Sequence, residues 1–220
     1  MSEPSSVAVV GATGGTGREV VERLAADGHL VTAFARTAHR LAREVDGVVT
    51  MDGDATDPEA VGAAVAGQDA VVVTLGIAEN PLRVRLTGPA RTPADVRSRG
   101  TRTVVEAARR HGARRLVVLS SFGVGETRRL LRPLDRLVLS ALLRPQIADT
   151  EAQERVVRES GLEWVLVRPV HLDDGPASEP LVATGGDVRG WRVSRASVAG
   201  VLAEAATSRR WTGSALAVSG

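Results

Sequence analysis

The 220-residue sequence contains no cysteine and no tyrosine, and every one of its 28 basic side chains is an arginine, because lysine is also absent. Without cysteine the chain can form no disulfide framework, thiolate nucleophile or zinc–thiolate site. We therefore expect no metal centre and a reducing, cytoplasmic setting. Aromatic residues make up only 2% of the chain, which leaves no stacking platform for single-stranded nucleic acid. These absences predict no nucleic-acid partner.

Long apolar runs are also missing. No run reaches the roughly 18 residues that a membrane helix needs, and residues 1–6 lack the basic start and apolar core of a signal peptide. The net charge is only +2, although the sequence pI is about 10.6. The high pI arises because arginine supplies all the cations, so it does not indicate nucleic-acid binding. Arginines alternate with acids along most predicted helices, which is typical of solvated faces.

Apolar runs and helix-type spacing alternate along the chain. We predict strands at 7–10, 30–36, 48–51, 70–76, 115–121, 163–169 and 215–218. We predict helices at 18–25, 38–45, 57–66, 95–111, 149–160 and 194–207. This alternation predicts an α/β fold, a Rossmann-type doubly wound parallel sheet with helices on both faces. We expect residues 1–220 to form a single domain.

Two stretches break the alternation, and we expect both to be insertions that line the pocket. The stretch 77–94 contains three prolines, and the stretch 122–148 contains an Arg- and Leu-rich part at 126–145. That part could be an amphipathic helix on a membrane surface or a partner. The alternative is a local helix that packs on the main body, which Pro133 favours because it interrupts any long helix.

The strand expected at 7–10 leads into a glycine-rich turn and then a helix. Its glycines, Gly11, Gly14 and Gly17, are spaced G-x-x-G-x-x-G, and Thr13, Gly15 and Thr16 fill the turn. In dinucleotide-binding folds such glycines allow the sharp turn, the approach of backbone to a pyrophosphate and close packing of the helix on the strand. The helix N-terminus offers free N–H groups to the phosphates. A plain strand-to-helix turn is the alternative, but the strand and the helix flanking the loop favour a nucleotide.

The end of the second strand indicates which dinucleotide fits. An acidic residue at this place binds the ribose 2′-hydroxyl of NAD, whereas an arginine accepts a 2′-phosphate. Here the position is Arg36, and Arg40 follows four residues later. Because an arginine can grip a phosphate with two charge-assisted hydrogen bonds, the sequence favours NADP(H) over NAD(H). The alternative is that both arginines face solvent.

Polar and small residues follow the other strands at the edge where open α/β sheets bind ligands. Asp54, with its neighbour Ala55, can take an adenine amino group or cap the next segment. Leu75 and Gly76 let a cofactor pass close to the backbone. Ser120 and Ser121 can bind a substrate carbonyl or a carboxamide. His171 can relay a proton or be an exposed loop histidine.

At these residues the chain resembles atypical short-chain dehydrogenase/reductase domains, the NAD(P)-binding group that includes NmrA-like proteins, and within it the biliverdin-IXβ reductase/flavin reductase type. The resemblance covers nearly the whole chain. It implies a phosphate loop at 11–17, a 2′-phosphate clamp at Arg36 and Arg40, and a pocket serine at Ser121. The run Pro169-Val170-His171 matches the last helix–strand unit, with His171 as a pocket histidine.

One departure shapes the functional expectation. Typical short-chain dehydrogenases use a Tyr-x-x-x-Lys pair, which a chain without tyrosine and lysine does not have. The resemblance still implies an NADPH-dependent reductase that passes hydride to a small conjugated acceptor such as a flavin, a quinone or a tetrapyrrole, with Ser121 and His171 as catalytic candidates. The alternatives are a carbonyl reductase of specialised metabolism, with Ser121 polarising the carbonyl, and a non-catalytic NAD(P) sensor. We expect a small-molecule substrate and a monomer or homodimer.

Overall fold

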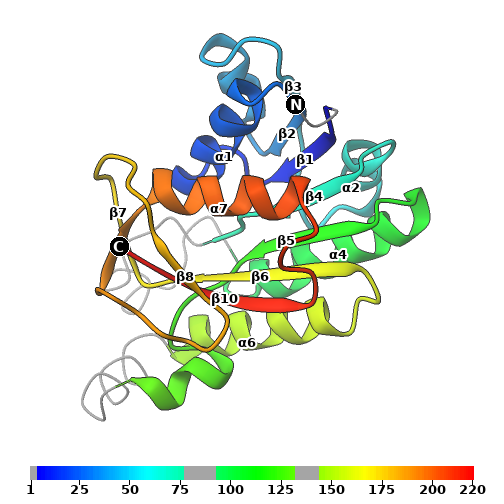
Figure 1. Cartoon of the computed structure of the whole chain (residues 1–220). Coiled ribbons are helices and arrows are strands. Elements are labelled where there is room, and N and C mark those ends of the chain that lie inside the picture. Colours follow the sequence, from blue (N-terminus) through cyan, green and yellow to red (C-terminus); the bar gives the residue numbers. More distant parts are fainter. Residues whose placement is uncertain (1–3, 77–92, 132–143) are drawn as a thin grey trace.

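A computed structural model describes residues 4–76, 93–131 and 144–220, and a single twisted sheet runs through its centre (Figure 1). The eight strands of this sheet lie in the order β3-β2-β1-β4-β5-β6-β10-β8. They are β1 Ser6–Val10, β2 Leu30–Ala35, β3 Val49–Asp52, β4 Ala70–Val73, β5 Arg115–Leu119, β6 Glu163–Pro169, β8 Leu181–Ala183 and β10 Ser214–Ser219. All neighbours are parallel except β8, which pairs antiparallel with β10. The order reverses between β1 and β4, where doubly wound sheets bind ligands.

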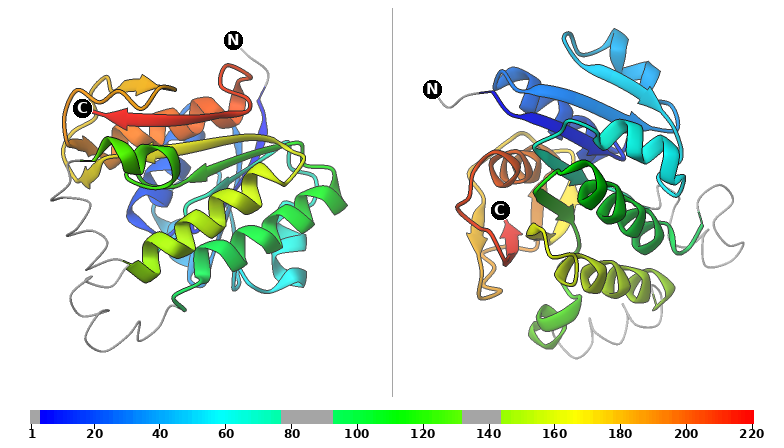
Figure 2. Two further views of the ribbon diagram at one scale, coloured as in Figure 1. Left: turned by 90° about the horizontal axis from the view of Figure 1, so that it is seen from below. Right: turned by 90° about the vertical axis from the view of Figure 1, so that its right-hand side faces the viewer.

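Helices cover both faces of the sheet, as the alternation of strands and helices predicts (Figure 2). One face carries α1 Gly15–Ala26 and α7 Arg195–Thr207, which pack against each other. The other face carries α2 Pro58–Val65, α4 Val96–His111 and α6 Arg144–Arg158, side by side in that order. Since both faces are covered, the central strands β1 and β4 are apolar on both sides, and Val7–Val10 are fully buried.

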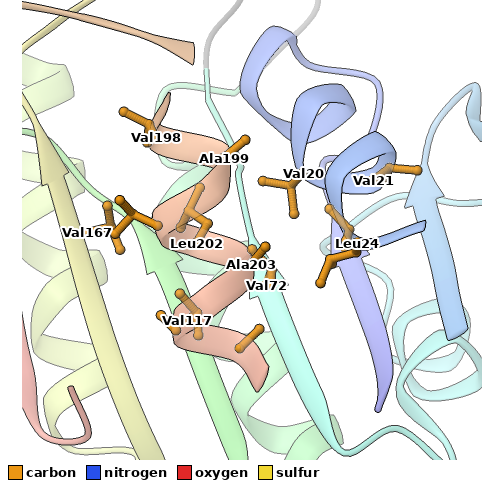
Figure 3. Close-up of a cluster of buried hydrophobic side chains, with 14 of the residues drawn as sticks. Val20, Val21, Leu24, Val72, Val117, Val167, Val198, Ala199, Leu202 and Ala203 are labelled. Atoms are coloured by element: carbon orange, nitrogen blue, oxygen red, sulfur yellow. The ribbon is translucent and has the colours of Figure 1, made fainter. Parts of the chain in front are cut away.

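The larger of two apolar clusters fills the space between the sheet and the pair α1 and α7. Figure 3 shows Leu202 of α7 beside Val117 and Val167 on the strands, and Val20 and Leu24 of α1 on the other side of α7. The second cluster lies beneath α2, α4 and α6. These clusters fix the strand ends that carry the polar residues discussed below.

Several helix ends follow from local chemistry. Asp57 caps α2 by accepting hydrogen bonds from the amides of Glu59 and Ala60, with Pro58 in the first turn, as its preferences predict. Helix α4 ends at Gly112, whose φ of 81° is left-handed, and Ser194 caps α7 through the amide of Ser197.

Other boundaries predicted from the sequence are wrong. Helix α6 begins at Arg144 rather than at Asp149, because Pro145 is tolerated in a first turn, where its missing N–H needs no partner. The short strands β7 His171–Asp173 and β9 Arg192–Ser194, which pair in parallel, and the strand β8 were not predicted. Runs of three residues carry too little periodicity to identify. Residues 74–76 and 120–121, predicted as strand, lie beyond β4 and β5 and border a cleft.

The two irregular stretches are described only in part. Residues 126–130 of the Arg- and Leu-rich part belong to the 3₁₀ helix η2, Gly125–Leu130. Residues 132–143 lie outside the described residues, as do residues 77–92 of the other insertion. A second 3₁₀ helix, η1 Ala38–Arg43, replaces the helix expected at 38–45. None of the helices that the structure describes is both long and apolar enough to cross a membrane.

Candidate functional site

A cleft of about 650 Å³ lies along the carboxyl ends of the central strands. Most of the residues proposed from the sequence line it. They are Gly11, Thr13, Gly14, Gly15, Thr16, Arg36, Asp54, Ala55, Leu75, Gly76, Ser120, Ser121, Pro169, Val170 and His171. Gly17 and Arg40 are not among the lining residues. The folded chain therefore brings together, in one cleft, proposed residues that are up to 160 positions apart, from Gly11 to His171.

The glycine loop is held in a shape that side chains at two positions would disrupt. Gly11 has a φ of +92°, and a Cβ there would lie 2.9 Å from the Thr74 carbonyl oxygen. At Gly17 a Cβ would lie 2.3 Å from the Gly11 carbonyl oxygen and 2.7 Å from Thr74 Oγ1. The Thr74 hydroxyl donates to the carbonyl oxygens of Val10 and Gly11. Gly17 thus serves the packing of α1 against the loop, and Thr74, which the sequence analysis missed, ties the loop to β4.

The N-terminus of α1 opens into this cleft. Its N-cap, Gly14, has no side chain to bond the first amides, and the first turn contains no acidic residue. The unpaired N–H groups and the positive end of the helix dipole favour an anion. Such an end is suited to a phosphate group.

Arg195, which lies in the first turn of the helix predicted at 194–207, adds a cation to the same place. A Cβ on Gly15 would lie 2.9 Å from Arg195 Nε, so the arginine side chain lies against the glycine loop and lines the cleft. Its guanidinium pairs with Asp174 at 2.5 Å. The pairing holds the side chain over the loop from the first turn of α7.

At the other end of the glycine loop, Arg36 directly follows β2 and lines the cleft with Asp54. Asp54 Oδ1 accepts hydrogen bonds from the amide and hydroxyl of Thr56, at 2.8 and 2.7 Å. These bonds lower the pKa of Asp54, and the positive charges of Arg36 and Arg99 lower it further. Asp54 therefore makes the turn-capping contacts that were the alternative to adenine binding. Arg40 is exposed on η1.

The two serines after β5 have different surroundings. Ser120 is buried, and its hydroxyl donates to Glu154 Oε1 at 2.5 Å. Ser121 is exposed in the cleft, and its hydroxyl makes a 3.2 Å bond to the Phe122 carbonyl oxygen. Ser121 is therefore the better placed of the two to meet a ligand, and Ser120 belongs to a network behind the cleft.

That network is a buried group of charges between β6 and α6. Arg168, at 4% side-chain exposure, donates to Glu154, at 5%, through Nε and Nη2, and Nη2 also reaches Glu126 at 2.6 Å. Burial lowers the pKa of Arg168, but the two carboxylates outweigh it and leave the pKa raised. The network connects the end of β5 to η2, and sequence reasoning missed it because its members are far apart in the chain.

His171 begins β7, two residues after the end of β6, and lines the same cleft as the glycine loop. Its amide donates to the Trp191 carbonyl oxygen at 3.2 Å, and its side chain is exposed at the cleft. Trp191 packs edge to face on Phe122, with ring centroids 5.8 Å apart. The small β7–β9 sheet thus places His171 at the same cleft as Ser121, and the aromatic pair connects the segments that follow β5 and precede β9.

The parallel sheet, the strand-order reversal and the uncapped helix beside a glycine loop define a Rossmann-type nucleotide-binding protein. Comparison with known proteins makes the class specific. A family described as NAD(P)H-binding matches residues 11–209. The chain belongs to this NAD(P)H-binding family, within the atypical short-chain dehydrogenase/reductases, and a nicotinamide dinucleotide is its ligand.

Characterised relatives of the chain are reductases by name. It is 32% identical over 227 residues to a (4-alkanoyl-5-oxo-2,5-dihydrofuran-3-yl)methyl phosphate reductase of Streptomyces griseus, covering 97% of this chain and 67% of that one. It is 46% identical over 115 residues to a 3-diazoavenalumate denitrifying reductase of Streptomyces sp., covering 52% of this chain and 37% of that one. The chain thus spans about a third to two thirds of the length of these relatives.

A solved structure has the same fold. ChuY, an anaerobillin reductase from Escherichia coli O157:H7, superposes with a TM-score of 0.77 at 24% identity, covering 97% of this chain and 96% of that one. At this identity the likeness is one of fold, and it agrees with the doubly wound sheet described above.

Proposed function

We propose that this protein is an NADPH-dependent reductase that delivers hydride to a small conjugated acceptor. The observation that carries the proposal is one continuous cleft, which runs from Arg36 past an uncapped helix N-terminus to Ser121 and His171. One part of the cleft is built for phosphates, and another offers a hydroxyl and an imidazole. The reductase names of the two Streptomyces proteins support the same activity.

The residues present fit a nicotinamide dinucleotide. Gly11 and Gly17 keep the loop in its tight shape, and the bare backbone of Gly14 and Gly15 lines the cleft, where a ligand can approach it. The first turn of α1, with no acid and no capping side chain, would hold the pyrophosphate with Arg195 beside it. Arg36 would hold the adenosine end, where a 2′-phosphate gives it a dianion to bind. This position supports NADP(H) over NAD(H).

The protein's contribution to the reaction is orientation and proton supply. When bound, the dinucleotide supplies hydride from its nicotinamide ring, and the protein does not itself undergo redox change. Ser121 would donate a hydrogen bond to an acceptor oxygen that gains negative charge. His171 would deliver the proton that accompanies hydride, so that the acceptor gains two hydrogens in total. Catalysis would then need neither tyrosine nor lysine.

The experiment that tests this proposal is an acceptor screen. Purified protein with NADPH is offered FMN, quinones, a tetrapyrrole and small ketones, and NADPH oxidation is followed at 340 nm. We expect turnover with a planar conjugated acceptor, and a kcat that is about 10- to 100-fold lower in Ser121→Ala and His171→Ala, as for lost proton transfer or hydrogen bonding. His111→Gln, at the exposed end of α4, is the matched control. NADPH binding without turnover on any acceptor would favour a dinucleotide sensor instead.

We further infer that the protein acts in the cytoplasm as one domain over residues 1–220, as a monomer or homodimer, with a small-molecule substrate. The absence of cysteine and the interleaved arginines and acids support this setting. Size-exclusion chromatography with light scattering distinguishes the two oligomeric states.

A further inference from the structure

A further cation, which is partly buried, lines the cleft, and the cofactor site described above does not use it. Arg97 lies in the first turn of α4 and borders the cleft beside Gly76. A Cβ on Gly76 would lie 3.4 Å from Arg97 Nη2, so the guanidinium lies against the backbone that follows β4. The guanidinium therefore lies at the carboxyl end of β4, next to whatever occupies that part of the cleft.

The guanidinium of Arg97 has an unmet hydrogen bond. Within the described chain, three buried side-chain atoms have no hydrogen-bond partner, namely Gln68 Oε1, Arg97 Nη1 and Gln153 Oε1. Of these three residues, only Arg97 lines the cleft. Because buried polar groups are nearly always paired in native proteins, an unpaired one needs an explanation. For Arg97, a ligand in the cleft would supply the missing acceptor for Nη1.

The nearby acid does not satisfy this nitrogen. Asp149 accepts hydrogen bonds from the backbone amides of Arg97 and Ser98, each at 3.1 Å, and so caps the start of α4. Burial lowers the pKa of Arg97, and the charge of Asp149 opposes that shift. An arginine side chain stays protonated in proteins, so a partly balanced positive charge remains at the cleft.

Arg97 approaches the cleft from the face opposite the phosphate-binding elements. Helices α1 and α7, which carry the glycine loop and Arg195, cover one face of the sheet, whereas α4 covers the other (Figure 2). The cofactor's phosphates therefore have their own partners. The space next to Gly76 and Ser121 is where the proposed acceptor must lie.

We propose that Arg97 is a specificity-determining residue that binds a carboxylate on the acceptor. A single guanidinium, already facing Asp149, matches a singly charged carboxylate better than a phosphate dianion, which would need a second cation. A carboxylate can accept hydrogen bonds from Nη1 and Nη2 together. With the carboxylate bound to Arg97, the conjugated part of the acceptor would lie toward Ser121 and His171. This inference rests on the proposed reductase function, because it names the class of substrate.

The test compares two probes of equal shape, 1-naphthoate and 1-naphthamide, which differ in charge. Calorimetry measures the binding of each to the protein saturated with NADP⁺, so no turnover is needed. We expect naphthoate to bind at least 10-fold more tightly than naphthamide to the wild type. Arg97→Gln should reduce this preference to less than 2-fold, Arg97→Lys should keep part of it, and Arg102→Gln, an exposed neighbour on α4, should keep all of it.

Other outcomes overturn the inference. Equal affinity for the two probes, or no measurable binding of either, would show that the pocket does not select carboxylates. A preference that survives in Arg97→Gln would assign it to another residue. Weaker NADP⁺ binding in Arg97→Gln, with the naphthoate preference intact, would place Arg97 on the cofactor. None of these results depends on reduction of an acceptor, so the failure of this inference is distinguishable from that of the reductase proposal in the acceptor screen.

Discussion

The buried charge pair behind the cleft offers a prediction with a definite size. Replacing Arg168 by Met removes the only cation bonded to Glu154 among the described contacts and leaves that carboxylate buried, at 5% exposure. Breaking a buried ion pair from one side costs about 3–5 kcal/mol, because the remaining charge has lost its partner. For a chain of this size, that loss lowers the Tm by roughly 6–20 °C, at about 2–4 °C per kcal/mol.

The assay is urea unfolding at pH 7, followed by the fluorescence of the three tryptophans. Arg209→Met is the control, because its ion pair with Glu163 at 3.5 Å is at the surface, with the arginine 75% exposed, and such pairs contribute about 1 kcal/mol or less. A loss of stability for Arg168→Met that is as small as the control's would refute the reasoning.

Three further predictions follow from other contacts. Gly17→Ala should lower the stability of the cofactor-free protein by about 1–3 kcal/mol, because the new Cβ would collide with the backbone of Gly11. Gly15→Ala should leave the Tm unchanged or raise it, because the new Cβ meets only the movable Arg195 side chain. Equal Tm shifts in the two variants would contradict this prediction. Arg195→Gln should weaken NADPH and NADH binding by the same factor, about 10-fold for one charged hydrogen bond, and an effect on NADPH alone would argue against a pyrophosphate contact. Burial raises the pKa of Glu126, but hydrogen bonds from its own amide and from Arg168 leave the pKa lowered. The stability lost in Glu126→Gln should therefore be full at pH 7 and disappear as the pH falls below about 4. A difference in the free energy of unfolding between the variant and the wild type that stays the same at every pH would exclude this linkage.

The fold was predictable because its signals are local. Each buried strand is a short apolar run, and several helix ends have a capping residue, such as Asp57 before α2 and Gly112 after α4. The edge strands β7, β8 and β9 were missed because three residues cannot show a period of two. Helix α6 was predicted to begin at residue 149 instead of 144, because a proline such as Pro145 is common both after the end of a helix and in the first turn of one.

The candidate site could be predicted only where its residues follow a strand or form the glycine loop. The residues that follow β1 to β6 are brought to one edge by the parallel topology alone, so Arg36, Ser121 and His171 could be proposed from their positions. Arg97 and Arg195 could not, because each enters the cleft from a helix start, and no local pattern distinguishes it from the other arginines. Ser120 appeared equivalent to Ser121 until Glu154, 34 residues away, was seen to take its hydroxyl.

We propose that Arg36 makes this cleft a site for a phosphorylated dinucleotide, and the direct test compares the affinities for NADPH and NADH. Fluorescence titration of the wild type should give a Kd for NADPH about 10- to 100-fold below that for NADH, since a charged hydrogen bond contributes about 1.5–3 kcal/mol. Arg36→Ala should weaken NADPH alone and bring the two Kd values together, while Arg43→Ala, on the exposed side of η1, should leave both unchanged. Equal affinities in the wild type, or a preference that persists in Arg36→Ala, would contradict the account.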